Sequence, residues 1–270
     1  LSSWALGDSA NCGLWLDEDG KLVGWAVMQS PFWTVDYAYQ PGLEDLHRCI
    51  LDWADGRANA LVGTQYARPA WFANVFAGQM ARRKTLEESG FACQADVGED
   101  SWSKVLMQRP GSLPVKEYRL PAGFVLRSLN GESEVEAYVA LHRAVFETKN
   151  MTVEWRRRTL HQPGYTPELD VVVAAPDGRL AAFCIGWLCR DAEGLRGQVE
   201  PLGCHPDFGR YGLGRIALCE VLRRLQSAGA GEIYVETDSY RNTAFALYES
   251  TGFRVIQDVL VYRKDYATEA

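Results

Sequence analysis

Three closely spaced glycines stand out in the segment from Glu200 to Arg215 (EPLGCHPDFGRYGLGR). Gly209, Gly212 and Gly214 leave the backbone free to curl, and the apolar spacing that follows predicts a helix beginning at this point. The unpaired N–H groups and the positive dipole end of that helix would face the same spot, which suits a pyrophosphate. The spacing matches neither the dinucleotide pattern G-x-G-x-x-G nor the P-loop, because no Lys-Ser/Thr pair follows. A helix-start turn that merely needs glycines is the alternative.

A carboxylate precedes this turn on the same predicted strand. Glu200 alternates with Leu202 and Cys204, so their side chains share one face, and Gln198 has the same parity. A carboxylate lining a cleft can accept the proton of an attacking ammonium, directly or through water, although it could equally bind the amine or be a strand-end charge. Cys204 beside His205 suggests a thiol nucleophile, but neighbouring strand residues point to opposite faces, which makes that pair unsuitable.

The C-terminal half contains the periodic patterns that would position these groups. Apolar runs predict strands over 124–129, 169–175, 180–188, 198–204, 232–236 and 255–263. Helical spacing predicts helices over 132–146, 150–155, 218–225 and 244–251, and Gly229 and Gly252 are natural stops after the last two. The order β-α-α-β-β-β-α-β-α-β predicts an α/β fold with a mixed central sheet and helices on both faces.

The same stretch, 124–265, resembles the GNAT superfamily of acyl-CoA N-acyltransferases. In that family a strand ending in a V-x-P-like step leads into Q/R-x-x-G-x-G/A and a long helix; here 204–206 (CHP) is similar to the step and 209–214 to the loop. A second family signature, N-x-x-A-x-x-L-Y-x-x-x-G-F, is similar to residues 242–253. The chain departs from the family at the first loop position, where Gly209 stands in place of Gln or Arg.

The resemblance implies acetyl-CoA as co-substrate, no metal, and roles for individual residues. Backbone groups of 202–204 would pair with the pantetheine arm like an added strand, and the loop would bind the pyrophosphate with Arg210 as the cation. Tyr248 would protonate the leaving thiolate, with a core tyrosine as the alternative, and Glu200 would be the catalytic base. Asn242 would contact the coenzyme or simply cap its helix. The expected coenzyme-binding residues are Leu202, Gly203, Cys204, Gly209, Arg210, Tyr211, Gly212, Leu213, Gly214, Arg215 and Asn242.

The N-terminal part resembles a degenerate copy of the same plan. Its patterns predict a hairpin over 13–28, a helix over 43–54 and a short strand over 60–65. The segment 85–91 (TLEESGF) echoes 246–253 (ALYESTGF), and aligning the two Gly-Phe pairs places Leu86 where the second copy has Tyr248.

A linker is predicted at 109–114 (RPGSLP), where two prolines and a glycine interrupt the periodic patterns. It divides the chain into a degenerate GNAT-like domain over 1–110, truncated at its N-terminus, and a catalytic GNAT domain over 111–270, two such domains in tandem. The first domain has no glycine-rich loop at 39–46, where the alignment would put it. We therefore interpret it as structural or as part of the acceptor site.

Composition restricts the class of partner. The 270 residues carry a net charge of −7, which argues against nucleic acid and fits a cationic substrate such as an amine. No run of about 20 apolar residues exists, which argues against a membrane span. Seven cysteines without a C-x-x-C pair and four histidines without metal-ligand spacing predict a reduced, cytoplasmic protein with no structural metal.

These observations predict an N-acetyltransferase that moves an acetyl group from acetyl-CoA to a primary amine of a small molecule. The amine would attack directly in a ternary complex, without a covalent enzyme intermediate. One alternative is an acetyltransferase acting on protein or peptide amines, and another is a non-catalytic CoA-binding regulatory module. The run Arg156–Arg158 is interpreted as a solvated helix face, with binding of an anionic acceptor or of the coenzyme 3′-phosphate as the alternative.

Overall fold

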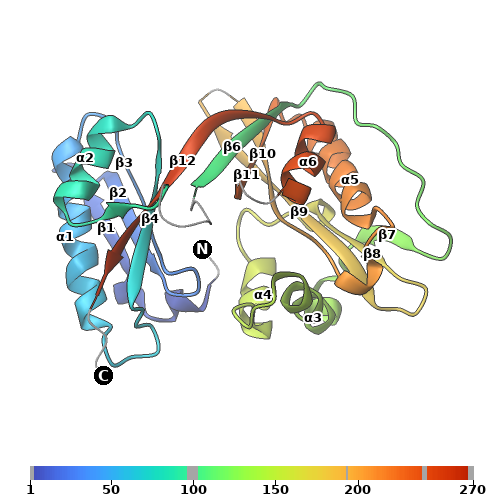
Figure 1. Ribbon diagram of the computed structural model, residues 1–270, viewed down its shortest axis with the longest axis horizontal. Helices are drawn as coiled ribbons and strands as arrows, with labels where there is room; N and C mark the ends of the chain where they lie inside the picture. Colours follow the sequence, from blue (N-terminus) through green and yellow to red (C-terminus); the bar gives the residue numbers. More distant parts are fainter. Residues whose placement is uncertain (1–2, 96–102, 193, 239–241, 267–270) are drawn as a thin grey trace.

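The computed structural model describes residues 3–95, 103–192, 194–238 and 242–266, which form two lobes (Figure 1). The N-terminal lobe contains β1 (Cys12–Leu16), β2 (Leu22–Gln29), β3 (Thr34–Tyr39), α1 (Glu44–Ala60), β4 (Ala70–Phe76), α2 (Met80–Glu88) and β5 (Ala92–Cys93). The C-terminal lobe contains β7 (Val125–Ser128), α3 (Val135–Phe146), α4 (Val153–Leu160), β8 (Asp170–Ala174), β9 (Leu180–Asp191), β10 (Gly194–Cys204), α5 (Leu213–Ser227), β11 (Glu232–Asp238) and α6 (Asn242–Ser250). Two more strands, β6 (Ser103–Pro110) and β12 (Arg254–Asp265), lie between them in the sheet.

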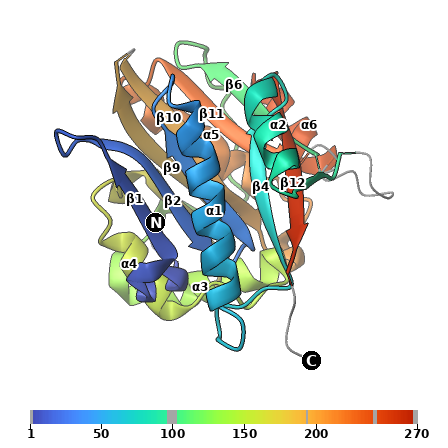
Figure 2. The same cartoon turned by 90° about the vertical axis from the view of Figure 1, so that its left-hand side faces the viewer.

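One sheet runs through both lobes in the order β1-β2-β3-β4-β12-β6-β11-β10-β9-β8-β7, and β5 pairs with β12 beside that path. In the N-terminal lobe α1 and α2 cover the outer face (Figure 2). In the C-terminal lobe helices cover both faces, because alternate residues of β8 point to opposite sides. Val171 and Val173 pack in the core under α5, whereas Val172 packs in the core under α3. The predicted mixed α/β fold and the order of its C-terminal elements are confirmed.

Local sequence explains where the main helices of the C-terminal lobe begin and end. The predicted apolar stripe of α5 is buried throughout, and the helix stops just before Gly229, whose φ of +89° suits glycine. Thr152 caps α4, since its hydroxyl accepts a hydrogen bond from the N–H of Trp155 at 3.0 Å. Across the described ranges, every helix is too short or too polar to span a lipid bilayer.

The N-terminal lobe differs from its prediction at the end of α1 and in its strands. The segment 60–65 is not a strand: α1 continues through Ala60, and the N–H of Leu61 donates to the carbonyl of Arg57 at 3.0 Å. Leu61 is buried like Ala54 and Ala58, so it extends the buried face of α1 by one more turn. Strands β3 and β4 were not predicted, although both are rich in aromatic residues, and β4 is one of the buried central strands.

The similar segments 85–91 and 246–253 also share a backbone hydrogen bond at the end of a helix. After α2, the N–H of Phe91 donates to the carbonyl of Leu86 at 3.0 Å; after α6, the N–H of Phe253 donates to the carbonyl of Tyr248 at 3.1 Å. The residue before each phenylalanine is a glycine with positive φ, as expected for this type of helix end. Leu86 therefore occupies in the first unit the position that Tyr248 occupies in the second.

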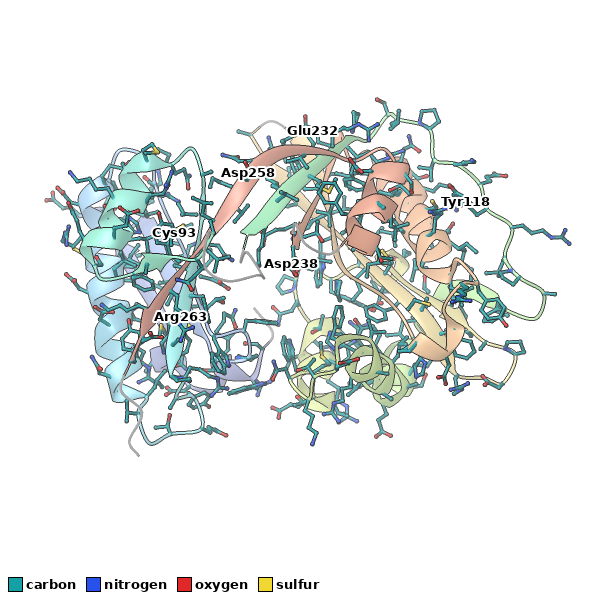
Figure 3. The ribbon with its side chains drawn as sticks, viewed as in Figure 1. Cys93, Tyr118, Glu232, Asp238, Asp258 and Arg263 are labelled. Carbon is teal, nitrogen blue, oxygen red and sulfur yellow. The ribbon has the colours of Figure 1, made fainter. Side chains whose placement is uncertain are left out.

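Strands β6 and β12 tie the two units together. β6 lies on the N-terminal side of the predicted boundary at 110/111, yet it is hydrogen-bonded between β11 and β12. The first half of β12 pairs with β6, whereas its second half pairs with β4 and β5 of the N-terminal lobe. Figure 3 marks Asp258 where β12 crosses from one lobe to the other. Each unit thus receives a strand from across the predicted boundary.

Arg109, at the end of β6, is a fully buried cation bonded to backbone carbonyls. Its guanidinium donates to the carbonyls of Thr251 at 2.9 Å, Pro110 at 3.0 Å and Pro114 at 3.2 Å, and also to Leu113. The Thr251 carbonyl lies just beyond the C-terminal end of α6, where the helix dipole favours a positive charge. Arg109 therefore joins the start of the linker to the helix that carries Tyr248.

We expect Arg109→Ala to lower the melting temperature substantially. The change leaves several buried carbonyls without a donor, at roughly 1–3 kcal/mol for each unsatisfied group, so a loss of about 3 kcal/mol or more follows. For a chain of this size that corresponds to a fall of about 6 °C or more by differential scanning calorimetry. Arg254→Ala is the matched control, because exposed Arg254 also donates to carbonyls at the end of α6, those of Glu249 and Phe253. Equal melting temperatures for the two variants would contradict a structural role for Arg109.

Candidate active site

Strands β10 and β11 pair only at their beginnings. Their parallel register runs from Arg196 to Gln198 on β10, after which β11 continues beside β6 and β10 continues beside β9. A bulge on β10 accompanies the separation, because Glu200 and Pro201 lie opposite the single residue Ile185 of β9. Among the residues that the structure describes, the β11-facing edge of 202–204 therefore has no strand partner, and the end of β11, marked by Asp238 in Figure 3, turns toward the N-terminal lobe.

The glycine-rich loop connects this open edge to α5. Gly212 is the residue preceding α5 and has φ of +72°, and Arg210 also has a positive φ of 70°. Successive turns of this kind orient backbone N–H groups toward one side, and α5 adds the N–H groups and dipole of its first turn. A Cβ built on Gly212 would meet no atom within 4 Å, so the space beside it is open.

A cavity of about 1090 Å³, here named the loop cavity, lies between β10, the start of α5 and α6. Most of the predicted coenzyme-binding residues line it: Leu202, Gly203, Cys204, Gly209, Arg210, Gly212, Leu213, Gly214 and Arg215. Tyr248 lines it from α6 and is 7% exposed, so the residue is mostly buried but still reaches the cavity wall. The sequence interpretation missed the end of α3, where Val145 and Phe146 close the cavity, because a helix end carries no chemical signature.

Three predicted residues need separate mention. Tyr211 is 54% exposed and does not line the loop cavity; its ring lies 5.5 Å from that of Phe124. Asn242 is the first residue of α6, but its side chain lies outside the described residues. Gly203 is required by close packing, since a Cβ there would lie 2.6 Å from Val145 and 2.8 Å from Phe183.

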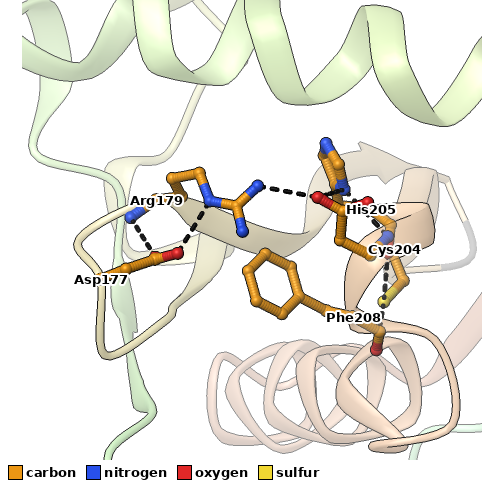
Figure 4. Close-up of polar contacts among 6 residues, drawn as sticks. Asp177, Arg179, Cys204, His205 and Phe208 are labelled. Atoms are coloured by element: carbon orange, nitrogen blue, oxygen red, sulfur yellow. Dashed lines mark hydrogen bonds and ion pairs between the residues drawn. The ribbon is translucent and has the colours of Figure 1, made fainter.

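Cys204 and His205 do not form a catalytic pair. The Cys204 thiol donates to the carbonyl of Phe208 at 3.6 Å, whereas His205 Nδ1 accepts the backbone N–H of Asp207 at 3.1 Å (Figure 4). Burial raises the pKa of the Cys204 thiol, which disfavours the thiolate that a nucleophile would need. Both side chains stabilise the turn that leads into the loop, with the Arg179–Asp207 ion pair beside them.

A second cavity of about 850 Å³, here named the lobe cavity, lies where the two lobes meet. Glu200 and Pro201 line it from β10, and Phe32 lines it from the N-terminal lobe. The ring of Phe32 contacts the ring of Trp155 of α4 edge-on, with 5.5 Å between the ring centroids. The Asn150 side chain donates to the carbonyl of Pro31 at 2.6 Å, so residues of both lobes form the cavity wall. The remaining lining residues are Tyr138, His142, Phe146, Thr148, Asn150, Met151, Trp155, Arg156, Thr159, Gln162, Ile185, Trp187 and Gln198.

The two cavities meet at Phe146 and at the β10 bulge. Phe146 lines both, and consecutive residues of β10 divide between them, with Glu200 and Pro201 in the lobe cavity and Leu202 in the loop cavity. A group held in the loop cavity would therefore reach a group held in the lobe cavity at this point. Tyr248 and Glu200, the two predicted catalytic residues, lie on opposite sides of the junction.

The surroundings of Glu200 change its hydrogen bonding and raise its pKa. Its carboxylate accepts a hydrogen bond from Gln198 Nε2 at 2.8 Å. Although the side chain opens onto the lobe cavity, surrounding protein partly desolvates it, and this burial, together with the charge of Glu236, raises the pKa of Glu200. Lys104, which pairs with Glu236 at 2.9 Å, partly offsets that effect. A carboxylate with a raised pKa is a stronger base than an ordinary one.

The interpretation of Arg156–Arg158 as one solvated face is wrong for Arg156. Arg156 is 1% exposed and forms an ion pair with Asp170, which is 0% exposed, whereas Arg157 and Arg158 face solvent and pair with acidic neighbours. Helical spacing explains the difference, because Arg156 lies next to buried Trp155 and one turn from buried Thr159 on the inner side of α4.

The equivalent region of the N-terminal lobe is filled by side chains. Strand β3, helix α1 and helix α2 correspond in order to β10, α5 and α6, and together they supply a packed cluster. The rings of Tyr37 and Tyr39 stack on His47 at 5.0 and 5.4 Å, and Arg82 lies over the Tyr39 ring at 4.1 Å. Burial and the nearby arginines Arg82 and Arg48 lower the pKa of His47 to about 4, so its ring is neutral near pH 7.

Comparison with known proteins agrees with this geometry. Residues 134–253 match the model of the acetyltransferase (GNAT) family. The mycothiol acetyltransferase of Thermobispora bispora is 30% identical over 165 residues, which cover 58% of this chain and 56% of the relative. That of Streptomyces coelicolor is 27% identical over 255 residues, covering 92% of this chain and 78% of the relative. In the first of these, the chain spans little more than half the length of the relative.

A solved structure shows the same architecture across both lobes. The tandem GNAT protein from the clavulanic acid biosynthesis pathway superposes with a TM-score of 0.65 at 12% identity, covering 96% of this chain and 85% of that one. The two lobes thus share the fold of a tandem GNAT protein, with two GNAT-like units. Within the C-terminal lobe, which carries the loop cavity, residues 134–253 are similar to the GNAT family of acetyltransferases.

We expect Gly212→Asp to weaken acetyl-CoA binding at least about 100-fold while the protein stays folded. Asp tolerates positive φ better than most residues, and repulsion between two charges about 4 Å apart near a protein surface is roughly 4 kcal/mol. Titration calorimetry measures the affinity, and circular dichroism confirms folding. Gly212→Asn is the matched control, because it adds the same volume without charge and should lose less affinity. Unchanged affinity in folded Gly212→Asp would show that this loop does not hold the phosphates.

Proposed function

We propose that this protein transfers an acetyl group from acetyl-CoA to a primary amine of a small molecule. The junction of the loop cavity and the lobe cavity carries the proposal, because it brings the glycine-rich loop and a separate cavity to one point. The enzyme would bind both substrates at once, and the amine nitrogen would attack the thioester carbonyl directly. Release of free thiol from acetyl-CoA in the presence of small amines tests this function.

The loop cavity is suited to coenzyme A along its whole length. The N–H groups at the start of α5 and in the 209–214 loop would bind the pyrophosphate. The unpaired edge of 202–204 would pair with the amide groups of the pantetheine arm, as an added strand does. An N–H group of the same edge would polarise the thioester carbonyl as negative charge develops on its oxygen. Arg210 would supply a cation beside the phosphates, as its place in the cavity wall supports.

Two side chains would move protons across the junction. Glu200 would accept the proton that the attacking amine loses, directly or through water. Tyr248 would donate its proton to the coenzyme sulfur as the carbon–sulfur bond breaks, which yields the amide and free coenzyme A. A phenol suits this role because it stays protonated near neutral pH. The first unit has Leu86 at the equivalent position and a packed cluster in place of the cavity, which supports a single coenzyme site in the C-terminal lobe.

The lobe cavity favours a small-molecule acceptor over a peptide. Its volume, about 850 Å³, lies within the usual range for small-molecule sites. Phe32 and Asn150 contact the opposite lobe at this cavity, so residues of both lobes form its wall. The relatives from Thermobispora and Streptomyces are mycothiol acetyltransferases, which also supports a small-molecule acceptor.

We expect Tyr248→Phe to reduce turnover about 100- to 10,000-fold, the usual contribution of a positioned general acid. Removing one hydroxyl keeps the ring and its edge-on contact with Phe253 at 5.7 Å, so coenzyme affinity should stay nearly constant. Initial rates of thiol release at saturating acetyl-CoA measure the effect, and titration calorimetry checks the affinity. A core tyrosine would behave in the opposite way, with a small loss of stability and little change in rate. More than about a third of wild-type turnover would remove Tyr248 from the mechanism.

We expect the pH profile of kcat/KM to change in Glu200→Gln. The wild-type base must be deprotonated, so activity should rise as pH passes through the raised pKa of Glu200, above the ordinary range of a carboxyl group. Gln cannot accept a proton, so the variant should lose this acidic limb and most of its rate at neutral pH. The part of the pH profile that arises from ionisation of the substrate amine would remain in the variant, because it does not depend on Glu200. An unaltered profile in the variant would place the base elsewhere, with a water held by Gln198 as the next candidate.

A further inference from the structure

The inner end of the lobe cavity contains polar atoms that have no partner within the described protein. Tyr138 is 0% exposed and Arg156 is 1% exposed, and both line the cavity. The Tyr138 hydroxyl and Arg156 Nε make no hydrogen bond in the described ranges, and His142 Nδ1, from the same cavity wall, makes none either. Buried polar groups normally find partners, because an unsatisfied group costs roughly 1–3 kcal/mol.

These three residues form one group, here named the polar floor. The Arg156 guanidinium lies over the ring of Tyr138 at 3.7 Å, and the rings of Tyr138 and His142 are 6.1 Å apart. Arg156 donates to Asp170, whose carboxylate also accepts the Tyr165 hydroxyl at 2.7 Å. Asp170 thus holds the guanidinium through its terminal nitrogen and leaves Nε unpaired.

The polar floor is close to electrically neutral. The positive charge of Arg156 is balanced by Asp170. Burial, together with Arg156 and Arg143, lowers the pKa of His142 to about 4, so the imidazole is uncharged near pH 7. Burial also raises the pKa of Tyr138, which keeps its hydroxyl protonated. An anionic group placed here would meet no uncompensated positive charge, so a neutral partner is favoured.

We propose that Tyr138 is a specificity-determining residue, whose hydroxyl, together with Arg156 Nε, binds an uncharged hydroxyl group at the end of the acceptor remote from its amine. This inference rests on the proposed acetyl transfer and identifies the class of amine that the site takes. The donor count supports it. A hydroxyl group accepts two hydrogen bonds and donates one, while the floor offers two donors, on Tyr138 and Arg156, and an acceptor when His142 carries its proton on Nε2.

The walls above the polar floor indicate what carries that hydroxyl. The same cavity, which Glu200 also lines, has four aromatic residues in its wall: Phe32, Phe146, Trp155 and Trp187. Aromatic faces of this kind pack against the C–H faces of a compact ring or chain, while the polar atoms at either end fix its direction. The acceptor is therefore an amine with an apolar or saturated-ring middle, its amine at Glu200 and its hydroxyl at Tyr138.

Three primary amines built on one ring test the proposal: cyclohexylamine, trans-4-aminocyclohexanol and trans-4-aminocyclohexanecarboxylate. With wild-type enzyme and saturating acetyl-CoA, we expect kcat/KM from thiol release to be at least about tenfold higher for the aminocyclohexanol than for cyclohexylamine. In Tyr138→Phe the ratio should fall to about threefold or less, mainly through KM. The variant should melt at or above the wild-type temperature, because it removes a buried hydroxyl that has no protein partner.

Tyr165→Phe is the matched control. It also removes one tyrosine hydroxyl, but that hydroxyl donates to Asp170 and Tyr165 does not line the lobe cavity. This variant should melt at a lower temperature and keep the wild-type preference among the three amines, the reverse of the Tyr138→Phe pattern. Opposite effects of the two variants on melting temperature and on amine preference would separate a role in acceptor binding from a role in stabilising the fold.

The remaining outcomes each decide the question. A wild-type preference for the carboxylate, no preference for the hydroxyl, or an unchanged ratio in Tyr138→Phe would overturn the assignment. Activity on other small amines with none on these three would also overturn it, because the ring with its hydroxyl is the class proposed. No thiol release with any amine would instead refute the proposed acetyl transfer, and the two failures are thereby distinguished.

Discussion

The separation of β10 from β11 is the constraint on which the site depends. Three residues of each strand pair in parallel, and beyond them β10 bulges at Glu200 and Pro201 while β11 follows β6. Within the described residues, this leaves an edge of β10 without a strand partner beside the start of α5. Unpaired backbone N–H groups are costly when buried and useful when a ligand can satisfy them. The same bulge divides consecutive side chains between the two cavities, so one local irregularity shapes both the loop cavity and the lobe cavity.

Because strands are exchanged between the lobes, the lobe cavity depends on both parts of the chain. β12 completes the sheet of both lobes, and β6 enters the C-terminal unit from the other side of the linker. The lobes are thereby held with Phe32 and Pro31 against α4. Arg109 fastens the linker to the end of α6, the helix that carries Tyr248. A change in the relation of the lobes would therefore alter the lobe cavity while leaving most of the loop cavity intact.

The two units have kept the same backbone plan and diverged in what fills it. In each unit a helix ends with a hydrogen bond from the backbone N–H of a phenylalanine to the carbonyl of the residue five positions earlier. That earlier residue is Leu86 in the first unit and Tyr248 in the second. Where the second unit is open, the first is packed with Tyr37, Tyr39 and His47. Packing of this kind stabilises a lobe by burying aromatic surface. The first unit has thus become a supporting wall that contributes Phe32 to the site.

The sequence by itself determined the order of elements in the C-terminal half, the glycine-rich loop and the residues beside it. These rest on short-range patterns, since helical periodicity, a glycine with positive φ and a strand's alternation are all encoded within a few residues. Tertiary structure decided the rest. Arg156 looked like part of a charged surface until α4 packed against β8 and brought it to Asp170. Tyr138 and His142 of α3 line a cavity that Phe32 also lines, although Phe32 is more than 100 positions away in the chain. Their proposed role therefore follows only from the tertiary structure. No local pattern reports such distant neighbours, because which side chains meet depends on how the sheet joins the lobes.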